Sequence, residues 1–92
     1  MATIKIPSPL RKLTDNQAEV SASGANIQEV LGDLANQFPK LAKNLLDGEG
    51  RLRSFVRLYL GDEDIAYLQK EDTAVQDDSV VSIIPAIAGG IN

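Results

Sequence analysis

The 92-residue chain contains no cysteine and no histidine. These two absences exclude thiolate catalysis, persulfide carriage, Ser-His-Asp triads and the usual zinc sites, because each of them needs a thiolate or an imidazole. A metal site or an acid–base site built from carboxylates alone stays open. The chemistry that a side chain of this protein can perform is therefore narrowly restricted.

Aromatic residues are scarce, with two phenylalanines, two tyrosines and no tryptophan. We therefore expect a core made mainly of Leu, Ile, Val and Ala. No apolar run approaches the roughly 20 residues of a membrane span, and the charged N-terminal segment does not resemble a signal peptide. The sequence predicts one domain, located in the cytoplasm and not bound to a membrane.

The formal net charge is −4 at pH 7. An acidic balance argues against nucleic acid as a partner, because binding to phosphates relies on basic patches. It favours a basic partner surface, or it serves only solubility.

The N-terminal segment predicts a hairpin. Thr3 to Pro7 alternates apolar and polar residues and is expected to form the first strand, which Pro7 and Pro9 then end or confine to an edge. Residues 10–16 form a polar turn in this interpretation. Gln17 to Ala22 is the returning strand.

A capped amphipathic helix is predicted next. Asn26 can accept a hydrogen bond from the amide of Glu29 while the Glu29 side chain reaches back, as in a capping box. The apolar residues that follow recur at spacings of three and four, which is typical of one buried helix face: Ile27, Val30, Leu31, Leu34 and Phe38. Pro39 disfavours helical geometry at Phe38, so the helix is expected to end there.

The second half predicts a short helix and three strands. Pro39 can open a short helix over Lys40–Leu46. Phe55–Leu60 is the clearest strand, 62–68 is a short strand or turn, and Ser79–Ile84 is a nearly continuous apolar run suited to a central strand. The order of elements predicts an α+β domain with one main helix and fits a β-grasp fold, but this pattern alone does not fix the topology.

Two segments resemble the MoaD/ThiS family of ubiquitin-like sulfur-carrier proteins. They are Phe55-Val-Arg-Leu-Tyr-Leu-Gly-Asp-Glu-Asp-Ile65 and the closing run Asp78-Ser-Val-Val-Ser-Ile-Ile-Pro-Ala-Ile-Ala-Gly-Gly90. The likeness is strongest to members that supply sulfur for cysteine synthesis. It implies a β-grasp (ubiquitin-like) fold, a mixed sheet covered by one main helix, with a domain over 1–88 and a flexible C-terminal tail over 89–92.

The resemblance also implies a chemical cycle centred on Gly90. An adenylating enzyme related to ubiquitin-activating enzymes would use ATP to form an acyl-adenylate at the Gly90 carboxylate, and sulfur would then replace AMP to give a thiocarboxylate. Gly89, Ala88 and Ile87 would thread the partner's channel. The carrier itself would bind no cofactor and would not be an enzyme.

A sulfur-accepting biosynthetic enzyme would complete the cycle. The first expectation is cysteine synthesis, and the second is molybdopterin synthesis, in which the carrier is the small subunit. The sheet face that bears Phe55, Arg57 and Tyr59 is a candidate surface for the activating enzyme. The ordinary alternative is that these side chains pack within the domain.

The chain departs from the family pattern after its glycines, because Ile91 and Asn92 follow Gly90. One interpretation is a precursor that a JAMM-type protease trims at the Gly90–Ile91 bond. The alternatives are an expression-derived extension or a lineage without carrier chemistry. Two other functions also stay open: a non-catalytic β-grasp interaction module, and a protein modifier conjugated to lysines through Gly90.

The acidic triplet Asp62-Glu63-Asp64 could in principle bind a metal, but a solvated acidic turn is the stronger expectation, as it is for Asp77-Asp78.

Overall fold

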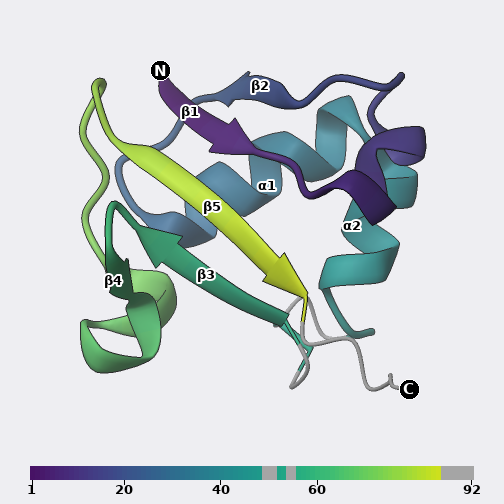
Figure 1. The fold of residues 1–92 in the computed structure, drawn as a ribbon. Helices are drawn as coiled ribbons and strands as arrows, with labels where there is room; N and C mark the ends of the chain where they lie inside the picture. The colour runs from purple at the N-terminus through teal and green to yellow at the C-terminus, as the bar shows by residue number, and fades with distance from the viewer. Residues whose placement is uncertain (49–51, 54–55, 86–92) are drawn as a thin grey trace.

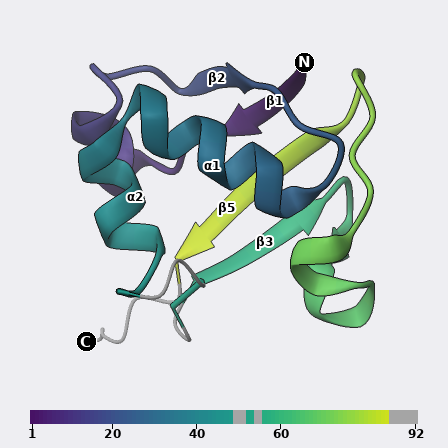
Figure 2. The same ribbon diagram turned by 180° about the vertical axis from the view of Figure 1, so that it is seen from behind.

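The computed structural model describes residues 1–48, 52–53 and 56–85. They form a five-stranded mixed sheet with two α-helices packed on one of its faces (Figures 1 and 2). The strands are β1 (Ala2–Lys5), β2 (Glu19–Ala22), β3 (Val56–Leu60), β4 (Glu63–Asp64) and β5 (Val80–Pro85). The helices are α1 (Ile27–Gln37) and α2 (Pro39–Leu45).

The strand order is β2-β1-β5-β3-β4. β5 is parallel to β1 and antiparallel to β3, while β1 with β2 and β3 with β4 are antiparallel pairs. The prediction of a central last strand is confirmed, because β5 has a neighbour on each side. The arrangement, a hairpin followed by a helix that crosses the sheet, is the β-grasp topology expected from the sequence.

The core lies between the sheet and the helices. Alternation along the strands turns Ile4, Leu58 and Ile83 toward the helices, and the apolar stripe of α1 meets them there. The buried apolar residues are aliphatic, as the scarcity of aromatics predicted: Ala2, Ile4, Ile6, Val20, Ala22, Ile27, Val30, Leu31, Leu34, Leu41, Leu45, Val56, Leu58, Ile65, Val75, Val81 and Ile83. Phe38 packs against this core while remaining half-buried.

The start of α1 is capped as predicted, with one difference. The Glu29 amide donates to Asn26 Oδ1 at 2.9 Å. The Glu29 carboxylate, however, accepts from the amide of Ala25 at 2.9 Å, one residue before the cap. The reciprocal bond of the expected capping box therefore exists, but it reaches the preceding residue. Phe38 caps the other end of the helix, so α1 ends at Gln37.

The segment expected to form a polar turn, residues 10–16, differs from that expectation. Ser8–Leu13 forms a 3-10 helix, η1, that directly follows β1. Leu10 and Leu13 pack against the core, and Thr14 is fully buried, with its hydroxyl donating to the carbonyls of Arg11 and Gln17. The apolar members of this segment therefore extend the core.

The acidic segment between β4 and β5 contains regular structure. It contains the 3-10 turns η2 (Ile65–Tyr67) and η3 (Lys70–Asp72). Beyond them, the Ile27 amide donates to the carbonyl of Thr73, and the Val75 amide donates to that of Ala25. This segment thus lies against the start of α1. None of the helices in the described ranges is long and apolar enough to cross a membrane.

Candidate functional site

The base of the C-terminal tail is held in the centre of the sheet. β5 ends at Pro85, which is in register with Val56 at the start of β3. The last strand was expected over Ser79–Ile84, but β5 also includes Pro85. A proline is tolerated there because it has no backbone N–H, and a residue at the end of a strand does not have to donate a hydrogen bond to the ladder. Four residues lie between Pro85 and Gly90, the glycine expected to react.

The predicted reactive and channel residues lie outside the described ranges. These are Ile87, Ala88, Gly89, Gly90 and Ile91, together with Phe55 of the predicted partner surface. The domain boundary expected at residue 88 is also outside them. The described structure thus locates the strand from which the tail departs, and two of the three predicted partner-surface residues.

Arg57 and Tyr59 lie on the sheet face opposite the helices. Figure 1 shows this face with no helix across it, and Figure 2 shows the helices on the other side. On the neighbouring strand β5, Arg57 is in register with Ile84, and Tyr59 is in register with Ser82. Arg57 is exposed and Tyr59 is half-buried. The two residues therefore share one face, as the period-two pattern predicted.

Ile84 is a surface residue that the sequence pattern concealed. It is 46% exposed, whereas the preceding Ile83 is 2% exposed. In a continuous apolar strand, the residues facing away from the helices cannot be recognised by alternation. The only available signal was that a single helix layer can cover one face of a sheet. Ile84 lines a shallow hollow on the uncovered face with Tyr59, Gly61, Asp62 and Ser82.

An ion pair fixes Arg57 on this face. Its Nη1 donates to Asp64 Oδ2 at 3.0 Å, and the amide of Ala66 donates to Asp64 Oδ1 at 2.9 Å. The Asp64 side chain is 7% exposed, whereas that of Arg57 is 54% exposed. The expectation of a uniformly solvated acidic turn is therefore wrong for Asp64, which the hairpin from β3 to β4 brings opposite Tyr59.

The environment of this pair shifts both pKa values in the direction that favours the charged forms, downward for Asp64 and upward for Arg57. The Ala66 amide lowers the pKa of Asp64, and Arg57 lowers it further, while desolvation acts in the opposite direction. The hydrogen bond and the charge of Asp64 raise the pKa of Arg57. Asp64 is thus an ionised carboxylate that holds Arg57 and the Ala66 amide in place, and its pKa does not suit proton transfer near neutral pH.

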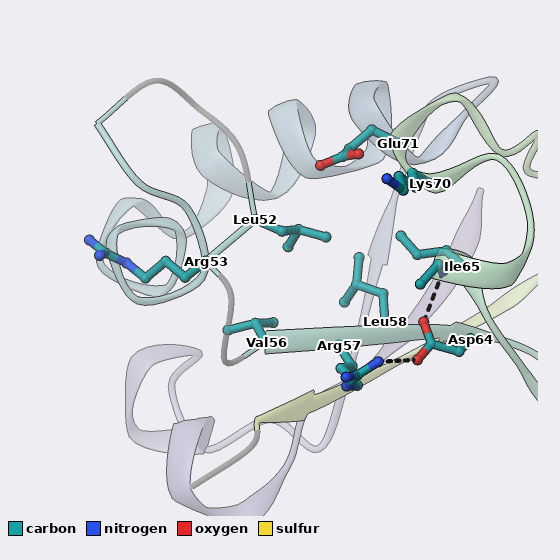
Figure 3. A pocket seen from close by; sticks show the side chains of 10 residues that line it. Leu52, Arg53, Val56, Arg57, Leu58, Asp64, Ile65, Lys70 and Glu71 are labelled. Carbon is teal, nitrogen blue, oxygen red and sulfur yellow. Dashed lines mark hydrogen bonds and ion pairs between the residues drawn. The ribbon is translucent and has the colours of Figure 1, made fainter. Parts of the chain in front are cut away.

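A hollow beside β3 has an apolar floor and a charged rim. Figure 3 shows Leu52, Leu58 and Ile65 converging on it, whereas Arg53 extends away. Lys70 and Glu71 line its far side. Within the described ranges, no group of three or more acidic side chains is placed to hold a metal ion. The acidic groups at this hollow are Asp64, which is already paired, and Glu71.

Comparison with known proteins identifies the family. The sequence pattern of the ThiS family matches residues 4–90, which is nearly the whole chain. The chain belongs to the ThiS family. The matched region includes both glycines of the tail and ends at Gly90, so that Ile91 and Asn92 lie beyond it. This confirms the MoaD/ThiS resemblance of the sequence.

Individual relatives agree in sequence and in fold. The chain is 39% identical to the sulfur carrier protein CysO of Mycobacterium tuberculosis over 90 residues, covering 96% of this chain and 97% of that protein. The crystal structure of M. tuberculosis CysO aligns with a TM-score of 0.86 at 36% identity, covering 95% of this chain and 100% of that one. A chain in the Amycolatopsis orientalis BexX/CysO complex aligns with a TM-score of 0.89 at 31% identity, covering 98% and 100%. These alignments confirm the ubiquitin-like β-grasp fold.

Proposed function

We propose that this protein is a sulfur carrier whose Gly90 carboxyl group is adenylated and then converted to a thiocarboxylate. The observation that carries the proposal is the family match, which extends from residue 4 in the first strand to Gly90 and ends there. Similarity to CysO over nearly the full length supports the carrier role. The tail that bears Gly90 continues from the central strand of the sheet.

The proposed cycle needs no nucleophilic side chain from the carrier. A free α-carboxyl group has a pKa of about 3.3–3.7 and is ionised at neutral pH. Its oxygen attacks the α-phosphorus of ATP, and pyrophosphate leaves. A sulfide-level sulfur nucleophile then attacks the carbonyl carbon of the acyl-adenylate, and AMP leaves. The absence of cysteine and histidine is compatible with this route.

The activating enzyme would supply what the carrier lacks. It would hold ATP, neutralise the phosphates and bring the carboxylate into line with the α-phosphorus. Gly89 and Gly90 have no Cβ, so the end of the tail can pass a narrow channel that a larger residue would block. Ala88 and Ile87 would lie in that channel behind them.

Removal of Ile91 and Asn92 would precede activation. Because Gly90 is followed by Ile91, its carbonyl is part of a peptide bond and has no free carboxylate to adenylate. Hydrolysis of the Gly90–Ile91 bond by a JAMM-type protease would release it. In this proposal the extension keeps the carrier inactive until it is trimmed.

The uncovered sheet face is the proposed contact with the activating enzyme. Arg57, Tyr59 and Ile84 lie on it in adjoining strands, and the tail follows Pro85, the residue after Ile84. A surface continuous with the base of the tail can be held by the enzyme while the tail enters its channel. Ile84 supplies exposed apolar area to this surface, and Arg57 supplies a cation.

Cysteine synthesis is the proposed destination of the sulfur. The support is the likeness to CysO, and the BexX/CysO complex indicates that a chain of this fold can assemble with a partner protein. Transfer to a molybdopterin synthase large subunit is the alternative within the same chemistry. The proposal places the cycle in the cytoplasm, where ATP is available.

Three forms of the chain would test the proposal: one ending at Gly90, one ending at Asn92, and one that lacks Gly90 and ends at Gly89. Each is incubated with the activating enzyme of the same organism, and ATP–pyrophosphate exchange is measured. Exchange with the form ending at Gly90 alone is the expected result. Exchange with none of the three, by an enzyme that activates another carrier, would contradict the proposal and favour an interaction module.

A further inference from the structure

The sheet topology separates two groups of charges. Because β1 and β5 are parallel and β3 is antiparallel to β5, the ends of β1 and β5 and the start of β3 meet at one end of the sheet. The tail leaves from that end. Figures 1 and 2 both show η1 and α2 there, and they show β4 and the 3-10 turns toward the other end.

The end from which the tail departs is basic. We define the basic end as Arg11, Lys12, Lys40, Lys43 and Arg53, which come from η1, α2 and the approach to β3. In the described segments 8–16, 39–48 and 52–53, these five side chains are accompanied by only two acidic ones, Asp15 and Asp47.

The opposite end is acidic. The acidic end comprises Asp62, Glu63, Glu71, Asp72, Asp77 and Asp78, and the one basic residue between positions 61 and 78 is Lys70. The net charge of −4 therefore conceals a molecule with two poles. The expectation of a basic partner, drawn from net charge alone, does not describe the end that carries the tail.

The cations of the basic end are available to a partner. Among residues 1–48, 52–53 and 56–85, the ion pairs are Met1–Asp77, Lys5–Glu19 and Arg57–Asp64, and none of them includes a member of the basic end. Lys12, Lys40 and Lys43 are exposed.

Two of these cations are also held in place by the backbone. Arg11 Nε donates to the carbonyl of Ile6 at 3.0 Å. Arg53 donates from Nε and Nη2 to the carbonyl of Lys43 at 3.3 and 3.2 Å. These two bonds also supply donors to a carbonyl in the last turn of α2. Each guanidinium keeps further N–H groups beyond these bonds. Positions fixed in this way lose less conformational entropy when a partner binds.

We propose that the basic end docks on an acidic rim around the channel of the activating enzyme and steers the carrier tail-first into it. This inference rests on the proposed function and names the chemistry of the partner's surface. An acidic rim attracts the basic end and repels the acidic end, so a carrier with two poles rotates its tail toward the channel during encounter. Such steering raises the association rate and weakens as salt screens the charges.

Two triple variants with the same net charge would test the proposal. Lys12→Gln, Lys40→Gln and Lys43→Gln together remove three positive charges from the basic end. The matched control, Gln69→Glu, Lys70→Gln and Gln76→Glu, lowers the net charge equally at the acidic end. All six side chains are exposed, so both variants are expected to keep the Tm of the unaltered chain.

The measurement is kcat/KM for ATP–pyrophosphate exchange with chains ending at Gly90. At about 30 mM salt, the lysine variant is expected to lose roughly fivefold or more in kcat/KM with unchanged kcat, and the control to lose little. The difference should shrink at about 300 mM salt, where the Debye length is near 6 Å. Equal losses in both variants would overturn the proposal, because net charge and not position would then decide.

Three other results are equally decisive. A loss of kcat/KM that persists at high salt would mean that the lysines act through short-range contacts and not through steering, and it would contradict the proposal. A loss seen only in sulfur transfer to the accepting enzyme would mean that the acidic rim belongs to that enzyme instead. If the unaltered Gly90-terminated chain supports no exchange at any salt concentration, the proposed function itself fails, and this result is distinguishable from failure of the docking proposal alone.

Discussion

Arg57 on β3 and Asp64 on β4 are joined by an ion pair of 3.0 Å between Nη1 and Oδ2. The Arg57 side chain is 54% exposed, whereas that of Asp64 is 7% exposed. β4 has only two residues and pairs only with the last two residues of β3. The pair therefore supplements a very short ladder, and it sets the position of a cation beside the strand from which the tail departs.

Replacing Asp64 by Asn should lower the Tm by a few degrees. Asn can still accept from the Ala66 amide, but its amide group would face the guanidinium of Arg57 as a second donor. Thermal unfolding followed by circular dichroism measures the change. Asp62→Asn is the matched control, because Asp62 is exposed in the same turn. Equal Tm values for the two variants would show that the ion pair contributes nothing.

The stability contributed by Asp64 should depend on pH. The pKa of Asp64 is lowered in the folded state from its ordinary value of 3.8. A lowered pKa means that the unfolded chain binds the proton more readily, so the contribution is fully present above about pH 5 and is lost as the pH falls through 3.8 toward the folded value.

Urea unfolding at pH 6 and at successively lower pH values tests this prediction. The difference in the free energy of unfolding between the unaltered chain and Asp64→Asn should be constant above about pH 5 and should decrease below pH 4. Comparison with the variant removes the contributions of other carboxylates that titrate in the same range. A difference that grows as the pH falls has the wrong sign for this account.

Ile83 and Ile84 should separate folding from partner binding. Ile83→Ala empties a buried position and should cost about 2–5 kcal/mol of stability. Ile84→Ala removes an exposed side chain from the same strand and should cost less than about 1 kcal/mol, while it raises KM for the carrier roughly threefold or more in ATP–pyrophosphate exchange. An unchanged KM would exclude Ile84 from the contact with the activating enzyme.

Asp33 should protect the edge strand β2. Its Oδ2 accepts from the Ser23 amide at 2.8 Å, and Gln37 Nε2 donates both to that oxygen and to the carbonyl of Ser21. Side chains of α1 thus occupy backbone groups that an edge strand otherwise presents to other chains. Asp33→Ala should speed hydrogen exchange at Ser23 and cost about 0.5–1.5 kcal/mol.

The matched variant for this prediction is Asp33→Asn, which keeps an acceptor oxygen. It should preserve slow exchange at Ser23. Sedimentation at increasing protein concentration should show association of Asp33→Ala but not of Asp33→Asn. Slow exchange and a monomeric state in both variants would mean that another feature protects this edge.

Local signals in the sequence predicted the fold well. The Asn26 cap, the spacing of Val30, Leu31 and Leu34, and the position of Pro39 fix α1, because each of them acts within a few residues. The apolar run of the last strand correctly indicated a central place in the sheet. The tail was recognised by resemblance, and its family was confirmed over residues 4–90.

The features that escaped prediction depend on register or on distant contacts. Asp64 is buried because the turn at Gly61 folds β4 back onto β3, and a polar triplet carries no sign of that pairing. Leu10 and Leu13 reach the core only after β1 is placed beside β5. The basic end arises because parallel and antiparallel strands bring segments 8–16, 39–48 and 52–53 together. Net charge summed along the chain cannot reveal such a separation.

The most direct test of the central claim is the intact mass of the chain ending at Gly90 after incubation with the activating enzyme, ATP and sulfide. The account predicts a mass gain equal to the replacement of one oxygen by sulfur, located at the C-terminal glycine by fragmentation. The chain ending at Gly89 and the chain ending at Asn92 should both keep their masses. An unchanged mass at Gly90 with an enzyme that modifies another carrier, or sulfur found on any other residue, would contradict the account.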